Sequence, residues 1–409
     1  MEEQYNIIIE EDGPNGPEET ERLDNLKTLI SQVLNEDLLY IGPEEIESLS
    51  DSLGNLTTLD LSNNWLGNEG VYGLSELLKE LTKLRTLNLS DNDIEYGSEI
   101  LKNINTTLTH LDIHRNLIRS EVESLTEAHL TELKYFDASE NEIGSESAES
   151  LVLVLSRCPG LTHLNLSGNN FGPEGSEQFG EVLTKLRALT YFNLSGNWIQ
   201  EEGASSIART LGLGLCDALV HLNLSENDIG PKGATILAGV LPKCTALSEL
   251  KLCDNNILSD GTVSIAQALP HCHKLSYFDF SGNWIGPEGA TSLCGVLSQC
   301  TALTRLEINA NGIEPEGATS LAGVLAKCTT LSRLNLSGNS IGCAGAMSLA
   351  QVLPQCTSLS SLRLCNNNIK SNAEHSLREV QLAYRLTLET ALIGLSVQRQ
   401  CPVLRSLDF

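Results

Sequence analysis

Cysteine and histidine are the residues of this chain that could bind a metal ion or act as nucleophiles, but their spacing argues against a metal centre. Six of the twelve cysteines occupy one position of an internal repeat: Cys158, Cys244, Cys272, Cys300, Cys328 and Cys356. The chain has no C-x-x-C pair, and structural zinc needs four converging ligands. The run His271-Cys272-His273 is no exception, because consecutive residues do not readily close a tetrahedral site alone. We therefore predict reduced cysteines that fill a buried turn, and no bound metal.

No sequence pattern typical of nucleophilic or nucleotide chemistry is present. Histidines and cysteines are scattered over repeat positions without a combination of nucleophile, base and orienting group. The chain lacks the glycine phrases that bind nucleotide phosphates, and Gly212-Leu213-Gly214 is an isolated loop sequence. The sequence therefore predicts a protein that is not an enzyme and needs no cofactor.

A second repeat position carries residue types that are suited to binding another protein; its residues form a column along the sheet. It is formed by the residue before the second leucine of a recurring L-x-x-L-x-L phrase, and side chains there project from one face of a sheet. Along the chain the column reads Thr58, Thr86, His110, Tyr135, His163, Tyr191, His221, Glu249, Tyr277, Arg305, Arg333 and Ser361. Exposed aromatic residues and arginine are typical anchors of protein interfaces, which favours protein binding. The alternative is that the aromatic rings only pack across neighbouring strands.

The three tryptophans also share one position. Trp65, Trp198 and Trp284 each directly follow the asparagine of a repeat, where other repeats place residues such as Asp93 or Asp228. This position lies in the loop after the strand, at the rim of the sheet face, and tryptophan is common at binding hot spots. The alternative is a ring folded over the neighbouring loop as a lid on the core, because tryptophan is usually largely buried.

A cluster of bases coincides with the two shortest repeats. The cluster consists of His110, His114, Arg115 and Arg119. Intervals of 24 and 25 residues separate the repeat asparagines there, so we expect less helix and a change in curvature. A kink specific to a partner and a neutral deletion of one helical turn are both consistent with this pattern.

All of these positions are set by a repeat with the phrase L-x-x-L-x-L-x-x-N-x-L. Eight of the eleven intervals between its asparagines are 28 residues, which marks a repeat architecture. The twelve asparagines are Asn64, Asn92, Asn116, Asn141, Asn169, Asn197, Asn227, Asn255, Asn283, Asn311, Asn339 and Asn367.

Each part of the repeat has a physical role. The leucines of L-x-L point into the core from a short strand, and adjacent strands stack in parallel. Where the chain turns away, the asparagine carboxamide can supply both a donor and an acceptor to buried backbone groups. A helix follows, with proline in its first turn at Pro173, Pro231, Pro287 and Pro315. Because a helix is wider than a strand, the repeats predict a curved α/β solenoid with parallel strands on the concave face and helices on the convex face.

From about Leu23 to Phe409 the chain resembles the ribonuclease-inhibitor-like class of leucine-rich repeats. This class includes ribonuclease inhibitor, the GTPase-activating proteins of Ran and the sensor domains of nucleotide-binding immune receptors. The resemblance rests on the 28-residue period, the phrase G-x-E-G-A near Gly172 and Gly286, and the cysteine before the next strand. It implies a horseshoe that acts as a non-catalytic scaffold or adaptor, with another protein held by the concave face and the strand-to-helix loops.

The same resemblance suggests an alternative, a GTPase activator similar to those that act on Ran. There an early repeat carries I-G-x-E-A-A-R, whose arginine is a candidate to stabilise the charge of the transferring phosphate. Here the matching segment runs from Leu66 to Tyr72 and places tyrosine where arginine is required. An arginine acting from elsewhere, such as Arg115 or Arg119, would be needed.

The net charge restricts the partners. With 53 acids against 26 lysines and arginines the formal charge is −27, which argues against nucleic acid and favours a protein partner with a basic patch. No segment approaches eighteen consecutive apolar residues, so we expect no membrane insertion. The first ten residues lack the pattern of a signal peptide, which predicts a cytoplasmic protein, with a nuclear location also possible.

The sequence divides into four expected parts. Residues 1–20 contain seven acids and no base, which is typical of a flexible acidic arm. Residues 21–55 are expected to form an N-terminal cap that begins with a helix, and residues 56–370 hold the twelve repeats. Residues 371–409 are expected to form a C-terminal cap, with a long helix from Ala373 to Val397 and a terminal strand at residues 404–409. That last strand either closes the solenoid or continues into a longer chain.

Overall fold

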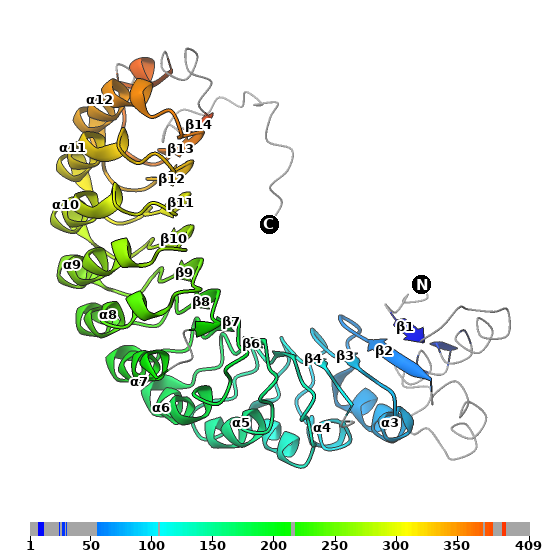
Figure 1. The fold of residues 1–409 in the computed structure, drawn as a ribbon. Helices are drawn as coiled ribbons and strands as arrows, with labels where there is room; N and C mark the ends of the chain where they lie inside the picture. The colour runs from blue at the N-terminus through cyan, green and yellow to red at the C-terminus, as the bar shows by residue number, and fades with distance from the viewer. Residues whose placement is uncertain are drawn as a thin grey trace.

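The chain forms a curved solenoid in which one parallel sheet lines the inside of an arc and helices form the outside (Figure 1). The computed structural model describes residues 7–11, 24, 27–28, 30, 55–104, 107–213, 217–370, 373–378 and 387–389. The predicted arrangement of strands on the concave face and helices on the convex face is confirmed. Within the described residues, no helix is long and apolar enough to cross a lipid bilayer.

The sheet contains fourteen strands in chain order among the described residues. β1 is antiparallel to β2, and every later pair is parallel and aligned at the same repeat position, as in Tyr277 beside Arg305. The strands are β1 (Ile8–Glu11), β2 (Leu56–Asp60), β3 (Thr86–Asn88), β4 (His110–Asp112), β5 (Tyr135–Asp137), β6 (His163–Asn165), β7 (Tyr191–Asn193), β8 (His221–Asn223), β9 (Glu249–Lys251), β10 (Tyr277–Asp279), β11 (Arg305–Glu307), β12 (Arg333–Asn335), β13 (Ser361–Arg363) and β14 (Thr387–Glu389).

In the described residues, the convex layer consists of one helical segment per repeat, with a short 3-10 turn after α8, α9 and α12. Proline lies in the first turn of α6, α8, α10 and α11, as predicted. The helices are α3 (Gly67–Glu80), α4 (Ser98–Leu101), α5 (Ala148–Leu155), α6 (Gly172–Leu183), α7 (Gln200–Gly212), α8 (Gly230–Ala238), α9 (Leu258–Ala268), α10 (Gly286–Leu297), α11 (Glu314–Leu325) and α12 (Gly342–Val352), and the 3-10 segments are η1 (Arg119–Thr126), η3 (Leu241–Lys243), η4 (Leu269–His271) and η5 (Leu353–Gln355).

The two short repeats have the reduced helical content that their length predicts. α4 has only four residues, and the next repeat replaces its α-helix with the 3-10 segment η1. In Figure 1 this part of the outer layer is visibly thinner than the stack from α6 to α12.

The repeat asparagines form a continuous hydrogen-bonded ladder beneath the loops. The Asn92 side-chain amide donates to the carbonyls of Leu61, Leu89 and Ser90 at 2.8–3.0 Å. Its Oδ1 accepts from the backbone N–H of Asn64 at 2.9 Å and Leu66 at 3.2 Å, so one side chain joins two repeats. All twelve asparagines are buried. The predicted structural role is thereby confirmed, because the carboxamide satisfies buried backbone groups that the turn leaves without partners.

The phrase G-x-E-G-A is explained by how closely adjacent helices pack. A Cβ atom on Gly317 in α11 would lie 2.6 Å from Ile313 Cγ2 and 2.9 Å from the Cβ of Ala290 in α10. No side chain fits at these separations, so the second glycine of the phrase is required for helix-to-helix contact.

The structure corrects the prediction for residues 1–20. Ile8–Glu11 are not an unstructured arm: they form β1, and Ile9 is buried against the core. A β-branched run at Ile7-Ile8-Ile9 favours a strand, and pairing covers the edge of β2 that would otherwise expose its backbone. The rest of the predicted arm lies outside the described residues.

The predicted caps are only partly described. Asp24, Lys27, Thr28 and Ile30 are helical, in agreement with a helix near Glu21 to Leu34, and Ile30 is buried. At the other end the predicted single helix from Ala373 to Val397 is wrong. Residues 373–378 are helical, but Thr387–Glu389 form β14, whose Leu388 aligns with Leu362 of β13. The segment contains a further L-x-L at Leu386 and Leu388, which supplies a thirteenth parallel strand; residues 404–409 lie outside the described residues.

Candidate protein-binding surface

Five consecutive aromatic residues of the concave column form a continuous stack of rings, in which the first three pairs are stacked and the last pair is tilted. Because the strands are in register, His110, Tyr135, His163, Tyr191 and His221 are lateral neighbours on β4 to β8. The successive ring centroids are 5.8, 4.3, 4.0 and 6.0 Å apart. The rings therefore do pack across strands, yet each keeps one edge open to solvent, since none of the five is fully buried.

The stack continues into charged pairs on the following strands. His221 Nδ1 lies 2.6 Å from Glu249 Oε2. The Tyr277 ring has Lys251 Nζ at 5.7 Å and Arg305 Cζ at 4.5 Å from its centroid, distances suited to cation–π contact. All the predicted concave residues from His110 to Arg333 thus lie on one row that crosses nine adjacent strands.

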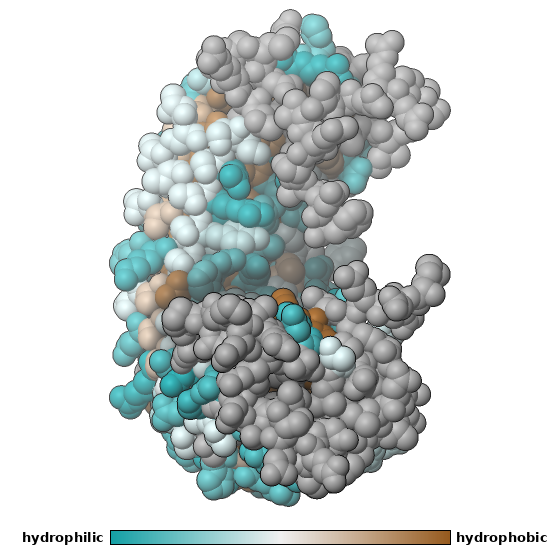
Figure 2. Space-filling view, turned by 90° about the vertical axis from the view of Figure 1, so that its right-hand side faces the viewer, coloured by the Kyte–Doolittle hydropathy of each residue, from teal (hydrophilic) through white to brown (hydrophobic). Residues whose placement is uncertain are grey.

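Partial burial keeps the centre of this row uncharged near neutral pH. Burial lowers the pKa of His110 and of His163, which favours the neutral imidazole. Burial also raises the pKa of Tyr135 and of Tyr191. Figure 2 is viewed from the open side of the arc, and the residues it colours are hydrophilic to intermediate with scattered apolar ones. The row offers a partly apolar strip inside an acidic protein.

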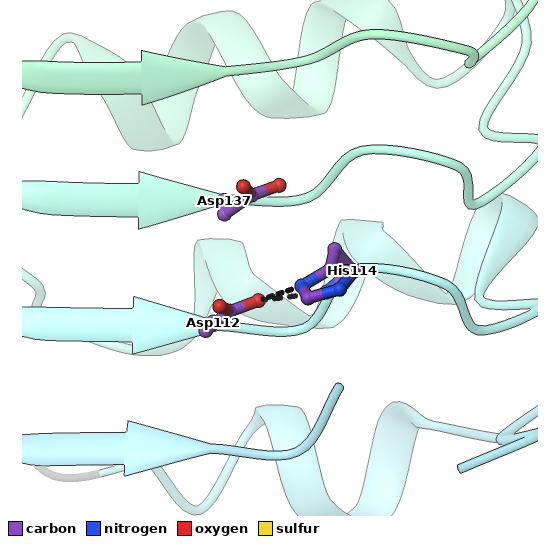
Figure 3. Close-up of side chains that lie close together, drawn as sticks. All are labelled: Asp112, His114 and Asp137. Atoms are coloured by element: carbon purple, nitrogen blue, oxygen red, sulfur yellow. Dashed lines mark hydrogen bonds and ion pairs between the residues drawn. The ribbon is translucent and has the colours of Figure 1, made fainter. Parts of the chain in front are cut away.

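At the carboxyl ends of the strands, next to the concave row, His114 lies between the carboxylates of neighbouring residues. Figure 3 shows Asp112 and His114 from one strand end and Asp137 from the next strand. His114 Nδ1 lies 2.7 Å from Asp112 Oδ1 and its Nε2 lies 3.3 Å from Asp91 Oδ2. The hydrogen bond to Asp112 is the main reason that the pKa of His114 is raised. Both ring nitrogens therefore face acceptors, an arrangement that suits the protonated imidazolium.

Asp112, His114 and Asp137 are also the one group within the described residues whose ligand atoms are close enough to share a metal ion. Several of their ligand atoms already have hydrogen-bond partners within the protein. Asp137 accepts from the backbone N–H and hydroxyl of Ser139 at 2.9 and 2.6 Å, and from Asn165 Nδ2 at 2.8 Å. The cluster is satisfied as a network of protein groups, so its geometry alone gives no reason to assign a metal.

The cluster of bases in the short repeats is not a free positive surface. Arg115 pairs with Glu140 at 2.9 Å and with Asp91 at 3.6 Å. Arg119 pairs with Glu95 at 2.9 Å and Glu142 at 3.1 Å. The sequence suggested a local basic patch because the carboxylates that neutralise it come from neighbouring repeats 23 to 25 residues away.

Arginines gather instead at the far end of the concave face. Arg305, Arg333 and Arg363 line a depression of about 420 Å³, whose lining also includes Glu307, Ser360 and Ser361. Arg305 donates to Glu307 at 2.8 Å, whereas Arg333 is exposed. The row thus changes from neutral aromatic rings to positive charge along its length.

The tryptophans are exposed. Relative exposures of 79% for Trp65, 61% for Trp198 and 69% for Trp284 show that none is a lid on the core, so that alternative is wrong. All three have left-handed backbone, with φ of 53°, 57° and 56°. The loop conformation, which sequence reasoning did not foresee, turns the side chain outward. Trp65 lines a depression of about 320 Å³ that also includes Asn63, Asp91, Asp93, Arg115, Asn116, Leu117 and Glu140.

The pairs of acidic residues beside the tryptophans were not predicted, although Asp93 and Asp228 were noted at the tryptophan position of other repeats. Asp91 and Asp93 flank Asn92, and Glu226 and Asp228 flank Asn227, so each pair lies in the repeat that follows a tryptophan. The sequence could have revealed these pairs, because the positions directly before and after each repeat asparagine recur with the same spacing as the asparagine and can be compared between neighbouring repeats.

The cysteine column agrees with the core-filling interpretation. Three cysteines of the column, Cys158, Cys244 and Cys272, are buried. Burial raises the pKa of Cys158 to about 12 and that of Cys272 to about 11. In the run predicted to be unsuited to metal, Cys272 points inward while His271 and His273 are exposed, so the three side chains do not converge.

Comparison with known proteins supports the same architecture. A family model described as a leucine-rich repeat matches residues 55–75, 80–97, 157–178, 185–208, 218–238, 271–294, 299–322 and 327–350. Among solved structures, the chain is similar to an internalin (inlF) from Listeria monocytogenes, with 19% identity, a TM-score of 0.53 and coverage of 91% of this chain and 95% of that chain. At this identity the likeness concerns the fold alone. None of the curated protein sequences matches the chain.

Proposed function

Because the chain is a leucine-rich repeat protein, we propose that it is a non-catalytic scaffold that binds another protein with its concave face and strand-to-helix loops. The observation that carries the proposal is the continuous row from His110 to Arg333, with exposed tryptophans at its rim. Repeats of this kind are typical protein-binding modules. The residues of this chain that would do the binding are our inference from the row.

Pre-organisation supports this assignment. The three central rings of the stack, Tyr135, His163 and Tyr191, are each held between two rings about 4–6 Å away, so little side-chain freedom remains to be lost on binding. Tyrosine and tryptophan combine a large apolar area with a polar edge, which is the combination found at interface hot spots. An open, partly apolar strip of this type is better suited to contact with a protein surface than to binding a small molecule, because a small molecule needs a more enclosed site.

The GTPase-activator alternative receives less support. Tyr72 is exposed on α3 at the position that would need arginine. Arg115 and Arg119 have the charge but are each engaged by two carboxylates. An arginine that stabilises a transferring phosphoryl group has to be free to approach it, so neither side chain is suited to that role as it stands.

The test is a triple variant of the row, Tyr191→Ala, His221→Ala and Tyr277→Ala, measured against a native partner identified by affinity capture and then purified. We expect binding to weaken by about 2–4 kcal/mol, the usual scale for central anchors. The matched control replaces three exposed residues of the convex helices with alanine: Tyr72, Ile236 and Val263.

Circular dichroism and thermal unfolding establish that both variants are folded. If the concave variant is folded and binds the partner as tightly as the control, the concave face is not the binding surface. Equal loss in both variants points to a general effect on the fold rather than to an interface.

A further inference from the structure

Two of the three exposed tryptophans have a pair of acidic residues in the next repeat. Asp91 and Asp93 follow Trp65, and Glu226 and Asp228 follow Trp198. In each pair the acids stand immediately before and after the repeat asparagine. Trp284 differs, because the residues in the corresponding positions are Ala310 and Gly312. The chain thus contains two tryptophan–acid clusters and a third tryptophan whose next repeat has no acid at these positions. On the other side of its loop, Asp254 of the preceding repeat lies against Gly282.

The asparagine ladder places each acid pair beside its tryptophan. Asn92 Oδ1 accepts from the N–H of Asn64 and of Leu66, the two residues on either side of Trp65. Asn227 Oδ1 accepts in the same way from Asn197 at 2.9 Å and Ile199 at 3.4 Å, on either side of Trp198. Because the acids are covalent neighbours of these asparagines, they lie in the adjoining loop.

At the first cluster the proximity is direct. Trp65, Asp91 and Asp93 line the same open depression of about 320 Å³. Asp91 is partly neutralised by Arg115 and His114, whereas Asp93 is exposed and makes no ion pair among the described residues. The depression therefore offers an indole ring and at least one carboxylate that is open to a ligand.

The second cluster carries more unbalanced charge. Glu226 and Asp228 are both exposed, and in the described part of the chain neither forms an ion pair. Asp228 accepts only a neutral hydrogen bond, from Asn256 Nδ2 at 2.7 Å. Two carboxylates beside an exposed indole form a site of strongly negative potential with an aromatic wall.

We propose that each tryptophan–acid cluster binds a lysine or arginine side chain of the protein partner. A cation over the face of tryptophan is attracted by the ring quadrupole, and nearby carboxylates add a charge-assisted hydrogen bond. Trp284 lacks such an acid pair and contacts the partner mainly through its apolar area. This inference rests on the proposed function and specifies the partner as one with a basic segment or basic surface.

The separation of the clusters favours a macromolecular partner. Five strand spacings lie between β2 and β7, or roughly 24 Å along the sheet at the usual distance between strands. An extended chain needs about seven residues to cover that length. One small amine cannot occupy both clusters, whereas a partner with two basic side chains at this separation can.

The three tryptophans allow each site to report separately. In the double variant Trp198→Phe/Trp284→Phe all tryptophan fluorescence comes from Trp65. The other two double variants retain only Trp198 or only Trp284. The probe is an acetylated, amidated peptide with two arginines separated by glycine, and its control is the same peptide with neutral citrulline in place of arginine. We expect a saturable change in fluorescence with the arginine peptide at Trp65 and Trp198. At Trp284, which lacks the acid pair, we expect a clearly smaller preference for arginine over citrulline.

A charge-removing variant gives the decisive comparison. In the protein that retains only Trp198, Glu226→Gln with Asp228→Asn is expected to weaken binding of the arginine peptide by about fivefold, and to leave the response to citrulline unchanged. The proposal is overturned if Trp198 responds equally to both peptides, or if removing the acids leaves the arginine affinity unchanged. Since these outcomes do not involve the concave row, a loss of native-partner binding in the Tyr191, His221 and Tyr277 variant would still support the proposed function.

Discussion

Replacing Asn227 with alanine is expected to lower the free energy of unfolding by about 3 kcal/mol, although the side chain contacts no ligand and lies in a loop. The Asn227 side chain makes five hydrogen bonds across two repeats. Its Nδ2 donates to the carbonyls of Leu194, Leu224 and Ser225, and its Oδ1 accepts from the N–H of Asn197 and Ile199. The size of the effect depends on which of these groups has another partner.

The carbonyls do have other partners. Leu194 O also accepts from Asn197 Nδ2 at 3.1 Å, Leu224 O from Asn255 Nδ2 at 2.9 Å, and Ser225 O from the N–H of Gly196 at 3.0 Å. Each carbonyl therefore keeps one hydrogen bond in the variant, and its remaining cost is small.

The two N–H donors have no substitute among the described residues. The Asn197 N–H has Asn227 Oδ1 at 2.9 Å as its acceptor, and the longer 3.4 Å contact serves Ile199. A buried donor left unsatisfied costs about 1–3 kcal/mol, so one well-formed and one weak bond together give about 3 kcal/mol. The nearby Asn223 is a suitable control, since its Oδ1 accepts one local bond from Ser225 N–H, and Asn223→Ala should cost about 1 kcal/mol or less.

Urea unfolding followed by circular dichroism and by the fluorescence of Trp198, next to Asn197, gives both stability changes. A long solenoid does not have to unfold in one step, so amide hydrogen exchange at Asn197 and Ile199 provides a local measurement. If Asn227→Ala costs no more than Asn223→Ala, and these two amides exchange as slowly as in the wild type, the ladder does not stabilise the loops in the way described.

Three further outcomes are expected. Because folding raises the pKa of His114, its native contacts stabilise the fold fully at a pH below the unfolded-state pKa, and this stabilisation is lost as the pH rises through the folded-state pKa. The wild type should therefore lose more stability than His114→Gln between about pH 6 and 9. NMR titration should give a higher pKa for His114 than for His110. Thiol titration of denatured protein without reductant should find twelve free cysteines, and a count of ten or fewer would contradict the prediction of a reducing, cytoplasmic environment. Ile9→Ala should lower stability by about 2 kcal/mol while Ile8→Ala, which truncates an exposed side chain of the same strand, should cost much less, as thermal unfolding can show.

The sequence was sufficient for the fold because the repeat is redundant. A single L-x-L or a single asparagine is ambiguous, but twelve copies at a nearly constant interval define the strand, the turn and the direction of stacking together. The ladder geometry follows directly, since each carboxamide meets the same backbone groups of the previous repeat. The lateral order of the concave row was predictable for the same reason, and the register places His163 beside Tyr191 as the phrase requires.

Prediction failed where the repeat no longer constrains the chain. The acidic composition of residues 1–20 concealed the short apolar run that forms β1, because an average over twenty residues gives little weight to three isoleucines. Helical periodicity after Ala373 concealed the L-x-L that becomes β14. In both cases the open edge of a sheet favours strand pairing, a tertiary effect that local patterns do not report.

The position after the repeat asparagine shows most clearly what the repeat constrains and what it leaves free. In eleven of the twelve repeats this residue has positive φ, Leu117 being the exception, and such backbone suits glycine, asparagine or aspartate. A bulky residue with φ above zero costs on the order of 1 kcal/mol, and tryptophan has no local advantage there. Burial does not offset the cost, because all three indoles are largely exposed. An energetic penalty without compensation inside the molecule is best explained by contacts outside it, and this explains why the rim is proposed to bind together with the concave row.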